Sequence, residues 1–162
     1  MGQRTGGAVL TAAALALSLV GGTARAGGGA PVGCVGPASS TWLQVSVEQV
    51  RNSAGYLVLT LYPDDPARFL KPMGSLYVVR VPARAGVTQA CLFVPNPGVY
   101  GLALYHDANA NAKIDRNAIG IPKEGFGFSN NPKILFSAPK LKSVRLAING
   151  PGASTRIRMR YP

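Results

Sequence analysis

The chain has 162 residues, of which 17 are lysine or arginine and 6 are aspartate or glutamate, so its formal net charge is +11. This length accommodates one domain of ordinary size. No later apolar run reaches the roughly 20 residues that a membrane-spanning helix needs, which excludes a further transmembrane segment.

The first 26 residues are typical of a secretory signal peptide. Arg4 precedes an apolar run from Ala8 to Val20, and Ala24-Arg25-Ala26 has the small residues of a cleavage site. The sequence therefore predicts a periplasmic or secreted protein with a signal peptide over 1–26, a flexible leader over 27–40 and one domain over 41–162. Without Arg4 and Arg25, 15 of the 17 basic residues remain against 6 acidic ones, a net charge of +9.

The positive charge is concentrated towards the C-terminus, where no Asp or Glu follows Lys133. Outside the cytosol, such a surface favours anionic lipid headgroups, lipopolysaccharide or acidic glycans over nucleic acid. We therefore expect the partner to be an anionic envelope polymer or an envelope protein, and not nucleic acid.

Short runs with period-2 alternation, separated by Gly, Pro and Asn, predict an all-β fold. Seven short strands indicate an antiparallel sandwich, immunoglobulin-like or transthyretin-like, with one long ordered loop over 107–140. A single helical turn is expected at 66–70. The strands are expected at 42–50, 56–62, 76–82, 87–94, 99–106, 141–148 and 154–161.

Cys34 and Cys91 are the only cysteines in the chain. In an oxidising compartment such a pair most simply forms one disulfide, the alternative being two free thiols.

The last expected strand separates two kinds of side chain by face. Ile157 and Met159 share the face of Thr155 and Tyr161, while three arginines, Arg156, Arg158 and Arg160, occupy the other. Such arginines either keep an edge strand solvated, which we favour, or bind an anion.

The segment that follows the fifth expected strand carries oxygen-bearing residues at every second position. Asp107, Asn109 and Asn111 match positions 1, 3 and 5 of a calcium loop, with the Lys113 carbonyl at position 7 and Asp115 at position 9. Ala112 stands where that loop needs Gly, and Ala118 where it needs Glu. Calcium is thus the one cofactor that the sequence suggests, with Glu124 as an additional carboxylate. The alternative is a set of Asx-turns without metal.

His106 is the sole histidine. Alternation places it on the inward face with Tyr100, Leu102 and Leu104, and Asp107 on the opposite face. We expect His106 to donate to a backbone carbonyl at the base of the loop, the alternative being a ligand or a general base. No Walker, GxSxG or HExxH pattern is present, and no catalytic residue is assigned.

Three motifs are similar to those of the small exported bacterial proteins of domain of unknown function family 2141. They are Asn96-Pro97-Gly98-Val99-Tyr100, then His106-Asp107-x-Asn109-x-Asn111-x-x-x-Asp115, then the run from Gly120 through Glu124-Gly125-Phe126-Gly127-Phe128 to Asn131. The resemblance implies a signal peptide and an exported β-sandwich, without an established activity. Phe126 and Phe128 either anchor the loop, which we favour, or line a shallow pocket.

Three functions follow as hypotheses. The first is a non-enzymatic exported module whose loop, 106–131, binds calcium and presents a binding surface. The second is an envelope hydrolase or sugar-processing enzyme that uses Asp107, Asp115 or Glu124 with His106. The third is attachment to anionic envelope polymers through Lys140, Lys142 and the arginine face.

Overall fold

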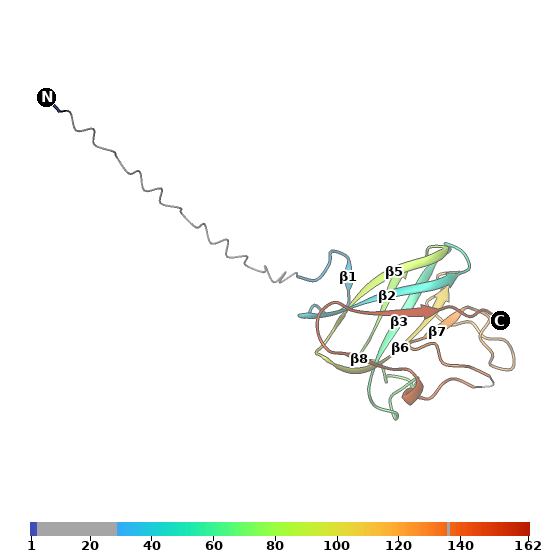
Figure 1. Ribbon diagram of the computed structural model, residues 1–162. Helices are drawn as coiled ribbons and strands as arrows, with labels where there is room; N and C mark the ends of the chain where they lie inside the picture. The colour runs from blue at the N-terminus through green and yellow to red at the C-terminus, as the bar shows by residue number, and fades with distance from the viewer. Residues whose placement is uncertain (3–28, 136) are drawn as a thin grey trace.

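The computed structural model describes residues 1–2, 29–135 and 137–162 (Figure 1). The signal peptide expected over 1–26 lies outside this part apart from its first two residues. The described chain is all-β, as predicted, with nine strands and one 3-10 helix. None of its helices is long and apolar enough to cross a membrane.

The first sheet has the strand order β1-β5-β2-β9. Its strands are β1 (Cys34–Val35), β5 (Gly86–Val94), β2 (Thr41–Val50) and β9 (Ala153–Arg158). β2 and β5 are antiparallel, but β1 pairs with β5, and β9 with β2, in parallel. The expected purely antiparallel arrangement is therefore wrong at both edges of this sheet. Each edge strand reaches its partner through a long connection, which allows parallel pairing.

The second sheet is antiparallel throughout and has the order β4-β3-β6-β7. Its strands are β4 (Tyr77–Pro82), β3 (Tyr56–Pro63), β6 (Gly98–Asp107) and β7 (Phe126–Phe128). β8 (Arg145–Ile148) also pairs with β6, over residues 98–101, while β7 pairs over 103–105. The two short strands thus follow one another along the same edge of β6.

Five of the expected strands coincide with β2 to β6 to within one residue at each end. The strand expected at 154–161 ends at Arg158, and the one expected at 141–148 opens with the 3-10 helix η1 (Leu141–Ser143). β1 and β7, of two and three residues, were not expected, because runs this short carry no periodicity. At 66–70 a turn forms in which the Phe69 N–H donates to the Asp65 carbonyl.

The two sheets share one hydrophobic core, as the alternation of buried and exposed positions predicts. Fully burying each such aliphatic side chain stabilises the fold by about 1.5–3 kcal/mol. The inward side chains of the two central strands are fully buried: Leu43, Val45 and Val47 in β2, and Leu57, Leu59 and Leu61 in β3.

A second, smaller cluster lies on the outer face of the second sheet. It joins Tyr62 and Ala103 of the sheet to Phe69, Leu141 and Val144 from the loops that cover this end, together with Phe128 of β7. The Tyr62 and Phe69 rings meet edge to face at 5.1 Å. Only part of the outer face is covered in this way, which leaves room for the cleft described below.

The predicted disulfide joins Cys34 to Cys91. It ties β1 to the neighbouring β5, where the same two residues are register partners. Residues 34 and 35, placed in the leader by the sequence, are therefore part of the first sheet.

Candidate functional site

His106 and Asp107 end β6 on opposite faces of the second sheet, as alternation predicts. Both are buried, with 1% of His106 and none of Asp107 exposed. The two side chains do not share a site.

Both ring nitrogens of His106 have hydrogen-bond partners inside the fold. Nε2 lies 2.8 Å from the Ala54 carbonyl oxygen, which can only accept, so this nitrogen carries the proton. Nδ1 lies 2.8 Å from the Tyr161 hydroxyl, which also accepts the Arg51 N–H at 2.9 Å. The Tyr161 hydroxyl hydrogen is thus directed at Nδ1. His106 pins the base of the loop and the end of the chain, and neither nitrogen is left for a substrate or a metal.

The Asp107 carboxylate holds the start of the loop. Oδ2 accepts the Arg80 guanidinium at 2.6 Å and the Ala112 N–H at 2.9 Å, and Oδ1 accepts the Asn111 N–H at 2.9 Å. Arg80 also lies over the Tyr56 ring at 4.7 Å. A buried carboxylate is stable when it is paired in this way, so Asp107 has a structural role that its sequence position does not reveal.

Asn109 and Asn111 turn their amide groups towards Asp115. Asn109 Nδ2 donates to Oδ2 at 2.8 Å, and Asn111 Nδ2 donates to Oδ1 at 3.1 Å. The Asn111 N–H and the Lys113 N–H donate in turn to the side-chain oxygens of Asn109 and Asn111. These are the Asx-turns that the sequence offers as the alternative to metal binding.

Ala110 and Ala112 have φ of 59° and 64°, in the left-handed region that favours glycine. The tight hook is therefore built in spite of two alanines. The hydrogen bonds to Asp107 and Asp115 hold the backbone there.

Glu124 closes the loop on its far side. Its Oε2 accepts the Asp115 N–H at 3.1 Å. Burial raises the pKa of the Glu124 carboxyl, the nearby Asp115 and Asp107 carboxylates raise it further, and the backbone hydrogen bonds from Asp115 and Ala108 oppose this. Glu124 and Asp115 are thus linked through the backbone of the loop.

Calcium binding stays a prediction. Each of the four oxygens of Asp107 and Asp115 already accepts a hydrogen bond, and the amide nitrogens of Asn109 and Asn111 point where calcium needs oxygens. Within the described ranges, no three His, Cys, Asp or Glu side chains come close enough to hold a metal ion. As arranged, the residues do not fit a calcium ion. One would have to turn both amides and compete with Arg80.

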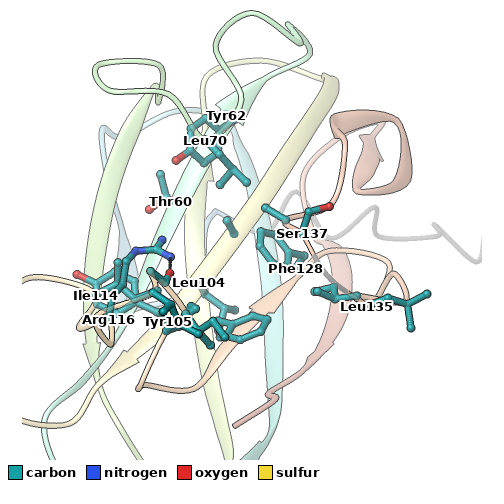
Figure 2. Close-up of a pocket in the computed structure, with 18 residues that line it drawn as sticks. Thr60, Tyr62, Leu70, Leu104, Tyr105, Ile114, Arg116, Phe128, Leu135 and Ser137 are labelled. Carbon is teal, nitrogen blue, oxygen red and sulfur yellow. Dashed lines mark hydrogen bonds between the residues drawn. The ribbon is translucent and has the colours of Figure 1, made fainter. Parts of the chain in front are cut away.

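An open cleft of about 760 Å³ lies beside this loop, on the outer face of the second sheet (Figure 2). Its floor is made by outward residues of β3, β6 and β7. Figure 2 shows Ile114 and Arg116 of the loop on one side and Leu135 and Ser137 on the other. The lining residues are Thr60, Tyr62, Leu70, Ala103, Leu104, Tyr105, Ile114, Arg116, Ile119, Gly120, Ile121, Pro122, Phe126, Phe128, Ile134, Leu135, Ser137 and Ala138.

The lining is mainly aliphatic and aromatic, and Arg116 is its one charged residue. Arg116 Nη1 donates to the Gly120 carbonyl at 2.7 Å, which holds the guanidinium against the loop. Three aliphatic lining residues are strongly exposed: Ile119 at 79%, Ile121 at 48% and Leu135 at 81%. Exposed apolar side chains gathered around a hollow are typical of surfaces that bind ligands or other proteins.

The sequence points to only part of this cleft. Phe126 and Phe128 line it, and Phe128, 8% exposed, also anchors the cluster over the sheet. Tyr105 lies on the face of its strand opposite to that of His106, as alternation predicts, and Thr60 alternates with the buried Leu59 and Leu61. Ile114 to Ile121 could not be placed, because an irregular loop gives no periodic signal.

The Ser129-Asn130-Asn131 triplet joins three separate segments. The Ser129 hydroxyl donates to the Val144 carbonyl and accepts the Leu102 N–H. Asn130 Nδ2 donates to the Arg145 carbonyl at 2.6 Å. Asn131 Nδ2 donates to the Arg156 carbonyl at 3.0 Å, while its Oδ1 accepts the Arg158 N–H at 2.7 Å. Asn131 thereby pairs with the free edge of β9 as a neighbouring strand would.

The fold and the cleft define a two-sheet all-β domain with an open apolar cavity on one outer face. A family model of uncharacterized proteins conserved in bacteria (DUF2141) matches residues 45–156, which run from within β2 to within β9 and include every lining residue of the cleft. The chain belongs to this family. Comparison with curated proteins and with solved structures gave no match.

Proposed function

We propose that this chain is a non-enzymatic binding module that acts in the periplasm or outside the cell, and that its ligand occupies the cleft beside the 106–131 loop. The expected signal peptide and the Cys34–Cys91 disulfide support an extracytoplasmic site of action. Two sheets around one core support a sandwich of the immunoglobulin-like or transthyretin-like type.

The cleft is the observation that carries the proposal. Its volume of about 760 Å³ lies within the range of roughly 300–1,000 Å³ that is typical of small-molecule sites. Its floor belongs to the paired strands β3, β6 and β7, and its exposed rim offers apolar area that a ligand would remove from water.

A hydrolase, the second candidate from the sequence, receives no support from this geometry. Glycoside hydrolysis needs two carboxyl groups facing each other across an open cleft, within about 10 Å. Neither His106 nor any of the carboxylates Asp107, Asp115 and Glu124 lines the cleft. His106 and Asp107 are buried, and their polar atoms are already engaged.

A neutral apolar dye, N-phenyl-1-naphthylamine, tests the proposal. We expect its fluorescence to rise on binding to the mature protein. Thr60→Phe places a ring on the floor of the cleft and should weaken dye binding at least about tenfold. Ser154→Phe, on an exposed position of the other sheet, is the matched control and should not.

Circular dichroism checks that both variants fold, and Ala138→Trp at the rim replaces Thr60→Phe if that variant does not. Dye binding that is equal in the wild type and in the folded cleft variants would contradict the proposal.

A further inference from the structure

A second hollow, of about 530 Å³, is lined by residues 132–133, 135, 137–140 and 142–143. Lys133, Lys140 and Lys142 line it, and all three are exposed. It shares Leu135 and Ser137, and also Ala138, with the apolar cleft. Leu135, Ser137 and Ala138 therefore lie between the apolar cleft and the hollow that the three lysines line.

The three lysines have no acidic partner among the described residues. The ion pairs there are Arg80 with Asp107, Arg145 with Asp64 and Arg158 with Glu48, none of which involves a lysine. No Asp or Glu follows Lys133 in the sequence. The hollow, which we call the lysine hollow, is thus a site of unbalanced positive charge that attracts an anion.

We propose that the ligand is a single-chain anionic lipid, with its acyl chain in the cleft and its headgroup on the lysine hollow. This inference rests on the proposed function and names the class of its ligand. An acyl chain matches the apolar lining, and each methylene that it buries adds to affinity. The anionic headgroup matches Lys133, Lys140 and Lys142, and fixes which end of the molecule leaves the cleft.

The shape of the site favours one lipid molecule over a bilayer surface. The cleft lies between Ile114 and Arg116 of the loop on one side and Leu135 and Ser137 on the other (Figure 2). A concave cavity encloses a single chain and buries most of its surface. A bilayer, in contrast, would contact only the rim, leaving the floor at Thr60 and Ala103 unfilled.

Displacement of N-phenyl-1-naphthylamine by monomeric lysolipids tests the inference. Lysophosphatidylglycerol is anionic and lysophosphatidylcholine zwitterionic, and the two are compared with the same acyl chain, below the concentration at which they form micelles. We expect the anionic lipid to bind at least about tenfold more tightly, since each lysine near an anionic headgroup contributes favourably.

The triple variant Lys133→Gln, Lys140→Gln, Lys142→Gln should lose this preference while it still binds lysophosphatidylcholine. The control is the triple variant Arg156→Gln, Arg158→Gln, Arg160→Gln. It removes the same charge from the arginine face near the C-terminus and should keep the preference for the anionic lysolipid. If both triple variants lost the preference for the anionic lysolipid equally, the preference would depend on net charge alone, and the inference would be overturned.

Equal affinity of the wild type for both lysolipids would also overturn the inference. If Thr60→Phe still weakened dye binding in that case, the proposed function would stand. Binding to phosphatidylglycerol vesicles without displacement by monomeric lysolipid would favour a bilayer surface and likewise overturn it. Failure of the wild-type protein to bind the dye at all would instead contradict the proposed function.

Discussion

At the scale of single residues, the polar groups inside the fold differ sharply in how well they are satisfied. His106 and Tyr161 complete each other's hydrogen bonds, and Tyr100 donates to the Asn96 carbonyl at 2.8 Å. The Tyr77 hydroxyl, in contrast, is buried and has no hydrogen-bond partner among the described residues. A buried donor without a partner costs stability, so this hydroxyl weakens the fold.

We expect Tyr77→Phe to leave the free energy of unfolding unchanged or to raise it by up to about 1 kcal/mol, because it removes only the unsatisfied hydroxyl. Tyr100→Phe is the matched control and should lower it by about 1 kcal/mol, since a hydrogen bond is lost. Urea unfolding at neutral pH measures both. A loss in Tyr77→Phe as large as in the control would show that Tyr77 has a partner after all.

Tyr77 should also make the stability of the fold depend on pH in the alkaline range. Burial, with a contribution from Tyr100, raises the pKa of Tyr77 to about 12, above its ordinary value of 10.0. The neutral form is therefore favoured in the folded state, and its contribution to stability is complete below pH 10 and lost as the pH rises towards 12. Tyr77→Phe should lose less stability than the wild type over this interval.

At this scale the sequence predicts which way a side chain points better than it predicts the hydrogen-bond partners of that side chain. Alternation correctly turns His106 inward, and a backbone carbonyl is the expected acceptor. Tyr161, its second partner, lies 55 residues away and could not be identified without the fold. The unsatisfied Tyr77 hydroxyl is equally invisible, because burial of a side chain is readable from the sequence but the missing acceptor is not.

At the scale of elements, the loop after β6 is held by its own hydrogen bonds. We therefore expect calcium to bind weakly, with a dissociation constant of about 1 mM or more, because it must displace Arg80 and turn two amides. At 1 mM calcium such binding adds at most about 0.4 kcal/mol. The melting temperature should then rise by no more than about 2 °C.

Differential scanning fluorimetry across a calcium series, with magnesium and an Asp115→Asn variant as controls, measures this shift. A large, saturable rise that Asp115→Asn abolishes would mean that the loop rearranges around the ion. The calcium hypothesis from the sequence would then be correct in full.

The composition of this loop shows why a motif can be recognised without its contacts. Asx-turn residues at every second position correctly indicate a hook. The pairing of Asp107 with Arg80 depends on strand register instead. Arg80 is opposite Val58 in β3 and Val58 is opposite Tyr105 in β6, which brings Arg80 and Asp107 onto the same outward face. No local pattern contains that information.

At the scale of the whole molecule, the disulfide closes a loop of 57 residues across the first sheet. In the chain-entropy account this stabilises the fold by about 4 kcal/mol. Dithiothreitol should therefore lower the free energy of unfolding by roughly this amount. The Cys34→Ala, Cys91→Ala variant should be less stable and should not respond to the reductant.

Denaturant unfolding with and without dithiothreitol provides the measurement. An unchanged midpoint on reduction would show that pairing between β1 and β5 alone secures this edge. Dye binding should persist after reduction if the protein stays folded, since no cysteine lines the cleft.

The architecture follows from the sequence to the extent that it depends on alternation. The positions of β2 to β6 and the inward face of β6, with Tyr100, Leu102 and Leu104 in the shared core, are predicted correctly. The parallel edges are not, because nothing in β9 or β1 indicates the direction of the strand beside which it will lie. The cleft is not predictable from the sequence either, since it arises where two long connections leave part of a sheet face open.

The amide of Asn131 also limits how molecules of this protein can associate. An uncovered edge strand invites the same strand of another copy to continue its ladder of hydrogen bonds, which leads to aggregates. Here a single side chain occupies the Arg156 carbonyl and the Arg158 N–H and closes that route with two bonds. Loss of this one side chain would expose the Arg156 carbonyl and the Arg158 N–H as a template for self-assembly.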